Sequence, residues 1–222
     1  MDPIIFLGIA AGPILIVAAV LFLLDFFLLY AVKPDQGKIY ALMYVGSLIA
    51  CMLVIASYLI LTGAFLTDSF SFQEVYTYSS SSLSVVYKLG GPWIGSSGSV
   101  LFITVLLSLI YGIYRLRGFE REDPVRTVAY QITDVFIVFF ILLTFVQSPY
   151  RQLPVTPIEG MGLNPLLQTP WVLSHPPIIF LGYVAVFFAF ILVLAGLITR
   201  TESHDLRSSV RLPLLAAWLL LT

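Results

Sequence analysis

The sequence predicts an all-α membrane protein: a polytopic bundle of five complete transmembrane helices and an incomplete sixth. Of its 222 residues, 59% are hydrophobic and 10% charged, whereas soluble domains average about 25% charged residues. The mean hydropathy of +1.01 agrees with this class. A net charge of −1 gives no field that would attract nucleic acid. The single cysteine, Cys51, has no partner for an intrachain disulfide.

Five apolar runs approach or exceed the roughly 20 residues that cross a bilayer as a helix. They cover residues 4–30, 39–66, 99–114, 128–146 and 177–198. The third run is short unless it begins nearer Trp93. A sixth run, residues 212–222, has 11 residues and cannot cross. Because backbone exposed to lipid must be hydrogen-bonded, we expect further residues or another polypeptide to complete it.

The basic residues predict the orientation in the bilayer, since cytoplasmic loops carry an excess of Lys and Arg. Nine of the eleven follow the first, third and fifth runs: Lys33, Lys38, Arg115, Arg117, Arg121, Arg126, Arg200, Arg207 and Arg211. Only Lys88 and Arg151 lie on the other side. We therefore expect a single membrane domain over residues 1–222, with an outer N-terminus and two long outer loops, residues 67–98 and 147–176.

Two acidic residues fall inside the predicted spans. Asp25 lies near the inner end of the first and Asp134 lies inside the fourth. An ionisable group at membrane depth is a functional candidate by default. Because the sequence offers no basic partner within the spans, we expect Asp134 to bond a neighbouring helix, with a proton relay as the alternative.

The second outer loop leads into the fifth run through His175, Pro176 and Pro177. The residue before a proline avoids the α region, and proline suits the first helical position. The pattern predicts a helix that starts at Pro177, with His175 just before it. The positive end of a helix favours a neutral imidazole, which is a common metal ligand and the usual proximal ligand of haem iron. The alternative is an interfacial histidine bonded to loop carbonyls.

Both outer loops carry a recognisable set of residues. The second loop and the following helix contain Ser148, Pro149, Pro154, Pro157, Gly160, residues 162–168, Pro170, His175, Pro176, Pro177, Gly182 and Tyr183. The first loop contains Tyr87, Lys88, Trp93, Gly95, Gly98 and Ser99. These residues resemble the loops of the CcmF family of cytochrome c-type biogenesis proteins, the haem-lyase membrane subunit. Ser96 and Ser97 depart from the family pattern, which has a His-Glu pair.

The resemblance implies a haem site on the outer loops. His175 matches an axial ligand of the iron of haem b, and the second axial ligand would come from another segment. Trp93 and Trp171 would wall the porphyrin, although either could instead be an interfacial anchor. Tyr87 and Lys88 are further candidates, and Lys88 would meet a haem propionate or lie at the interface. Pro176 and Pro177 would fix the histidine, and no catalytic residue is identified.

The implied function is that of a haem-lyase subunit in a prokaryotic cytoplasmic membrane, or in the mitochondrial inner membrane. It would help to form thioether bonds between haem vinyl groups and the cysteines of Cys-x-x-Cys-His in apocytochrome c. The implied partners are a CcmE-like haem chaperone, a CcmH-like thiol-handling protein and the lipid bilayer. The family's tryptophan-rich signature is missing, so we expect the N-terminal portion of a split or truncated member, whose other half supplies the second histidine.

Two other functions remain open. A transporter subunit would explain a buried acid such as Asp134, but the sequence has no inverted repeat or pair of broken helices. A membrane cytochrome b anchor would need pairs of histidines within the spans. The other histidine, His204, falls among charged residues on the opposite side of the membrane from His175, where we expect a solvated loop.

Overall fold

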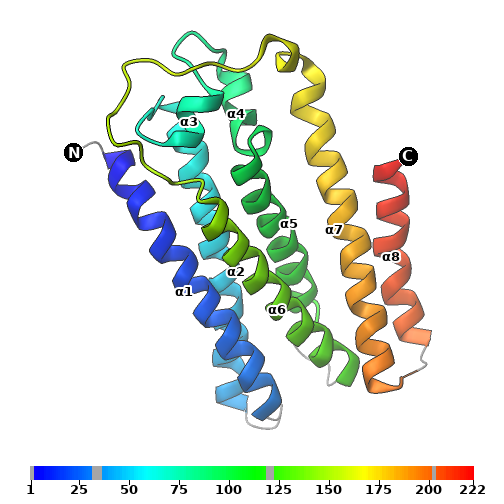
Figure 1. Cartoon of the computed structure of the whole chain (residues 1–222). Coiled ribbons are helices and arrows are strands. Elements are labelled where there is room, and N and C mark those ends of the chain that lie inside the picture. Colours follow the sequence, from blue (N-terminus) through cyan, green and yellow to red (C-terminus); the bar gives the residue numbers. More distant parts are fainter. Residues whose placement is uncertain (1–2, 32–36, 119–122, 202–203) are drawn as a thin grey trace. The chain divides into compact units, whose positions relative to one another are not determined.

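The computed structural model describes residues 3–31, 37–118, 123–201 and 204–222, and most of these residues are helical (Figure 1). The helices are α1 (Pro3–Ala31), α2 (Gly37–Leu66), α3 (Gln73–Tyr78), α4 (Val85–Ile94), α5 (Ser96–Leu116), α6 (Pro124–Gln147), η1 (Pro165–Leu167), α7 (Pro170–Thr199) and α8 (His204–Leu221). Within these ranges, the only β-type pairing is an isolated bridge between Phe72 and Gln152. The predicted all-α class is confirmed.

Five helices are long and apolar enough to cross a membrane, as predicted: α1, α2, α5, α6 and α7. The third predicted span is longer than its apolar run, because α5 extends to 21 residues through small and polar residues at its start. The sixth helix also begins earlier than its apolar run: α8 has 18 residues and starts at His204. His204 therefore belongs to a helix rather than to a loop. Lys33, Arg121 and the side chain of His204 lie outside the described parts.

The predicted start of the fifth helix at Pro177 is wrong. Helix α7 begins at Pro170 and includes Pro176 and Pro177 in its second and third turns. A proline inside a helix removes one backbone hydrogen bond, to the carbonyl four residues earlier. The Pro-Pro pair therefore leaves two carbonyls, those of Val172 and Leu173, without their helical hydrogen bonds. The proline at the first helical position is Pro170, whereas the sequence predicted Pro177 for that position.

The chain divides into two compact units. Unit 1 comprises Met1–Ile16, Leu53–Val105 and Phe140–Pro177, and unit 2 comprises Val17–Met52, Leu106–Phe139 and Ile178–Thr222. Both long loops belong to unit 1. In its core, the fully buried ring of Phe72 packs against Gly8 of α1, where no Cβ would fit. Gly91 of α4 packs in the same way against the ring of Phe65 on α2.

The core of unit 2 joins α6 to α7 through a cluster of buried apolar side chains. Its members are Val125, Ala129, Phe188, Ile191, Leu192 and Ala195. Burial of such residues is the main favourable term for packing in water. Within a bilayer, van der Waals contact and interhelical hydrogen bonds take over that role. The fit of small alanines against larger side chains supplies such contact here.

Unit 2 also contains a buried ion pair that the sequence analysis missed. Arg115, counted there among residues flanking the spans, is 1% exposed. Its Nη2 donates to Asp25 Oδ1 at 2.8 Å, and its Nε donates to Ser47 Oγ at 3.2 Å. Tyr111 Oη donates to the other oxygen of Asp25 at 2.8 Å. The ring of Tyr130 lies 4.4 Å from the guanidinium carbon. The expectation that the spans hold no basic partner is therefore wrong.

Asp134 lies at the edge of this cluster. It is 1% exposed, and its carboxyl oxygens make no hydrogen bond to the described residues. Nη1 of Arg115 is likewise buried without a hydrogen bond in the described part of the chain. Asp134 interacts electrostatically with both Asp25 and Arg115. Arg115 therefore pairs directly with Asp25 and keeps one donor, Nη1, without a hydrogen bond to the described residues.

Candidate functional site

The two long loops are joined by backbone hydrogen bonds within unit 1 (Figure 1). Gln73 N donates to Arg151 O, and Leu153 N donates to Ser71 O, both at 2.8 Å. Further along the second loop, Met161 N donates to Tyr76 O at 2.7 Å. Irregular segments must satisfy their backbone groups just as helices do. The pairing holds the two long loops together within unit 1.

Glu159 adds a side-chain link between the loops. Its carboxylate accepts hydrogen bonds from Ser81 N at 2.7 Å, from Ser81 Oγ, and from Gly160 N at 3.0 Å. These hydrogen bonds lower the pKa of Glu159 below its ordinary value of 4.5, because they stabilise the charged form. The tip of the second loop is thereby held on the residues that precede α4.

Glu74 is a structural residue that the sequence analysis did not identify. It belongs to α3, is 8% exposed, and accepts a hydrogen bond from Gly98 N in the first turn of α5 at 3.1 Å. The first amides of a helix have no intrahelical partner, and a carboxylate there is favoured by the helix dipole. Burial nevertheless raises the pKa of Glu74 above its ordinary 4.5. Glu74 thus caps α5 although it lies 24 residues earlier in the chain. The capped amide follows Ser97, one of the two serines that depart from the family pattern.

Lys88 is buried in unit 1 next to an acidic residue. It is 5% exposed, and Nζ lies 2.5 Å from Asp68 Oδ2. The charge of Lys88 is therefore matched within unit 1, and a contact with a haem propionate stays a prediction. Its neighbour Tyr87 is half-buried at the start of α4.

Trp93 at the end of α4 holds the start of α7. Its Nε1 donates to Val172 O at 3.0 Å. This is the carbonyl that Pro176 leaves without its helical hydrogen bond, so the indole replaces the missing donor. Gly90, one turn before Trp93, sits so close to Leu173 that an added Cβ would lie 2.9 Å from Leu173 Cδ2. Trp93 therefore holds the first turns of α7 in place. The prediction that Trp93 walls a porphyrin did not include this contact.

His175 lies on the second turn of α7, exposed, and one turn after Trp171, which is 76% exposed. Residues four apart share one face of a helix. The imidazole makes no hydrogen bond or ion pair to the described residues, whereas Pro176 and Pro177 are half-buried on the turn behind it. The described residues hold no group of three or more His, Cys, Asp or Glu arranged to bind a metal. His175 is therefore available as a single donor beside an aromatic ring.

The structure brings α4 and the start of α7 together through Trp93 and Val172, and it places Trp171 and His175 on one exposed face. Lys88 is paired with Asp68 in the same unit. A single imidazole with an apolar neighbour suits a cofactor that needs one axial ligand from this segment and an apolar slot.

Comparison with known proteins gives consistent results. Residues 93–221 match the family described as "Cytochrome C assembly protein". The CcmF cytochrome c-type biogenesis protein of Escherichia coli is 29% identical over 218 residues, which cover 96% of this chain and 33% of the relative. The corresponding protein ccl1 of Rhodobacter capsulatus is 33% identical over 171 residues, or 77% of this chain and 26% of the relative. The chain thus spans about a third of the curated relatives' length or less.

A solved structure titled "Cytochrome c Heme Lyase CcmF" has the same fold. Its TM-score is 0.76 at 21% identity, and the match covers all of this chain and 35% of that one. The predicted helical membrane fold and the predicted family agree with both kinds of comparison. The chain belongs to the Cytochrome C assembly protein family.

Proposed function

We propose that this chain is part of a cytochrome c haem lyase and supplies one axial ligand, His175, to haem b. The observation that carries the proposal is the exposed imidazole of His175 at the start of a membrane helix, one turn after the exposed Trp171. Family membership gives the context, because the relatives are named as cytochrome c-type biogenesis proteins.

The residues at the start of α7 fit a haem. Haem binding needs a nitrogen donor with an accessible lone pair and apolar surface for the porphyrin. His175 provides the donor, and the exposed ring of Trp171 lies on the same helical face. With a single imidazole at this position, the sixth iron ligand would come from another segment or from a partner chain.

The role of the chain in the reaction is to hold and orient a cofactor. Bound haem would supply two vinyl groups, to which the cysteine thiols of a Cys-x-x-Cys-His apocytochrome add as thioethers. His175 would hold the iron, and Trp93 would keep the His175 turn in place through Val172 O. This turn would be supported by Tyr87, Pro176 and Pro177. Lys88 would contribute indirectly, through its ion pair with Asp68.

The proposal includes the compartment and the partners. The loop residues 67–98 and 147–176 would face the outer side of a prokaryotic cytoplasmic membrane, or the corresponding side of the mitochondrial inner membrane. There they would meet a CcmE-like haem chaperone, the apocytochrome and its CcmH-like thiol-handling partner. The portion of the relatives that this chain does not span would supply the tryptophan-rich signature and the second histidine.

Haem content tests the ligand assignment. With the protein expressed in its natural complex, His175→Ala should remove most of the haem absorbance at unchanged protein yield, together with cytochrome c maturation. His204→Ala is the matched control, as the other histidine of the chain. Equal haem content in the two variants would reject the assignment.

Cysteine labelling tests the orientation separately. We expect a cysteine placed at residues 155–160 to react with a membrane-impermeant maleimide in intact cells, and one placed at Arg200 to react only after lysis. The native Cys51 is buried and contributes little background. The reverse labelling pattern would place His175 on the wrong side of the membrane for the proposed reaction.

A further inference from the structure

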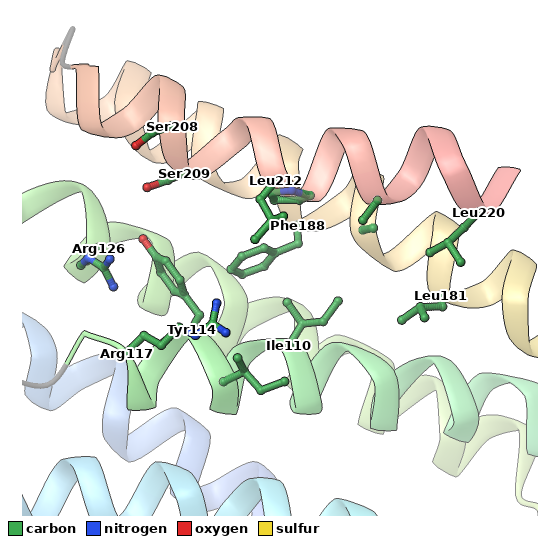
Figure 2. Close-up of a pocket in the computed structure, with 14 residues that line it drawn as sticks. Ile110, Tyr114, Arg117, Arg126, Leu181, Phe188, Ser208, Ser209, Leu212 and Leu220 are labelled. Carbon is green, nitrogen blue, oxygen red and sulfur yellow. The ribbon is translucent and has the colours of Figure 1, made fainter. Parts of the chain in front are cut away.

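A cavity of about 340 Å³ lies among α5, α6, α7 and α8 in unit 2 (Figure 2). Its volume falls at the lower end of the roughly 300–1,000 Å³ of small-molecule sites. Figure 2 shows its polar side chains gathered at one end, with Arg117, Arg126, Ser208 and Ser209, and apolar side chains along the rest. The cavity therefore has one polar end and is apolar over the rest of its length.

The polar end carries two guanidinium groups. Arg117 follows the last turn of α5, is exposed, and forms no ion pair with any described acidic residue. Arg126 lies in the first turn of α6, with its guanidinium carbon 4.6 Å from the ring centre of Tyr114. Its Nε is 3.9 Å from Asp123 Oδ2, and its buried Nη1 makes no hydrogen bond to the described residues. Two guanidinium groups at one end of an otherwise apolar cavity are suited to a phosphate.

The apolar part of the cavity is lined by exposed apolar side chains of helices long enough to cross a membrane, and of α8. Leu212 is 64% exposed and Ile113 is 50% exposed on its rim, and α5 and α7 are both candidate spans. Along α8 the apolar lining runs from Leu212 to Leu220, which is about 12 Å at the helical rise of 1.5 Å per residue. One leaflet of a ~30 Å hydrocarbon core is about 15 Å deep. The apolar part is therefore long enough for most of an acyl chain in one leaflet.

We infer that this cavity binds an anionic phospholipid, with its phosphate on Arg117 and Arg126 and an acyl chain along Phe188 and Leu212. Basic pockets between membrane helices bind lipid head groups in this way. A free phosphate would leave the apolar part unused, and a neutral lipid would bring no negative charge to Arg117 or to Nη1 of Arg126, which makes no hydrogen bond to the described residues. The site lies in unit 2 and does not depend on the haem proposal.

Lipid selectivity of the complex in mild detergent gives the first test. By native mass spectrometry, we expect phosphatidylglycerol to be retained in preference to phosphatidylcholine. The double variant R117Q/R126Q should lower the affinity for phosphatidylglycerol about thirtyfold, which is ~2 kcal/mol at ~1 kcal/mol per basic residue. Arg200→Gln removes an exposed charge outside the cavity, at the end of α7, and should leave the affinity unchanged. Equal retention of the two lipids, or an equal loss in R200Q and the double variant, would overturn the inference.

A second variant keeps all charges. Ala216 lines the apolar part of the cavity, so Ala216→Phe should fill it and abolish lipid retention while Arg117 and Arg126 remain. Unchanged retention in A216F would overturn the inference. A photoreactive phenylalanine analogue at position 216 should cross-link to lipid in membranes. Cross-linking to a polypeptide instead would show that a helix of the longer protein fills the cavity, which would also overturn it.

Discussion

Ionisable side chains occur in both units, but their surroundings differ. In unit 2, Arg115 and Asp25 are 1% and 2% exposed and are bonded to each other, and Tyr111 and Ser47 add hydrogen bonds to the pair. In unit 1, His175 is exposed and makes no hydrogen bond to the described residues. A charge with every partner inside the fold stabilises structure, whereas an exposed donor with no partner is available to a ligand. Asp25 and Asp134 were predicted as functional candidates because they lie at membrane depth. Position in the membrane alone does not distinguish a structural charge from a side chain that is available to a ligand.

The largest expected effect follows from breaking the buried pair. Arg115→Ala leaves Asp25 charged and unpaired in the helix core, which should cost about 3–5 kcal/mol of stability. Arg200→Ala, exposed and outside the cavity, should change stability by no more than ~0.5 kcal/mol. Thermal unfolding in detergent measures both. If R115A melted at the same temperature as R200A, the ion pair would not be a structural element of unit 2.

The hydrogen bond from Trp93 should have an intermediate effect, confined to unit 1. Trp93→Phe keeps an aromatic ring beside Phe102, whose ring centre is 5.6 Å away, but removes the donor to Val172 O. A buried carbonyl left unpaired costs about 1–3 kcal/mol. We expect faster hydrogen exchange at residues 170–175 and roughly tenfold weaker haem binding, without a comparable loss in unit 2.

A compensating variant separates this hydrogen bond from simple packing. Pro176→Ala restores a backbone N–H four residues after Val172, so the double variant W93F/P176A should recover much of the hydrogen-exchange protection. Trp171→Phe is the control, since Trp171 is 76% exposed and its change should not affect exchange at these residues. No recovery in the double variant would mean that Trp93 acts through contact area alone.

The smallest effect concerns pH. Burial raises the pKa of Glu74 above 4.5, so the folded state binds this proton more tightly and the associated stability is lost as the pH rises through the raised pKa. Hydrogen bonds lower the pKa of Glu159, so its contribution is present above pH 4.5 and is lost as the pH falls through the lowered pKa. Differences in melting temperature between wild type and Glu74→Gln, and between wild type and Glu159→Gln, should therefore change with pH in opposite directions. Parallel changes would contradict both assignments.

Hydropathy was sufficient to predict the five spans and the helical class, because lipid requires long apolar helices with internal hydrogen bonds. It failed where a partner lies far along the chain. Arg115 was placed outside the membrane because Asp25, 90 residues away, gave no local signal. The start of α7 was placed seven residues late, since Pro176 and Pro177 indicate a helix start only when no donor such as Trp93 replaces the missing bond.

The candidate site was likewise predicted only where the signal is local in the sequence. The sequence pointed to His175, Trp93 and Trp171, which the structure places at the start of α7 or against it. It did not indicate that Lys88 pairs with Asp68, 20 residues earlier, or that Glu74 caps α5. Both contacts depend on how the long loop folds back on itself, and local patterns do not encode that path.

The role of His175 is the central claim, and ligand rescue tests it most directly. His175→Gly, purified in its complex and titrated with imidazole, should regain the haem absorbance and the spectral signature of an imidazole-ligated iron. Trp171→Gly treated in the same way should show no dependence on imidazole. If H175G retained the wild-type haem spectrum without added imidazole, His175 would not be the ligand, and the proposed haem site at the start of α7 would be wrong.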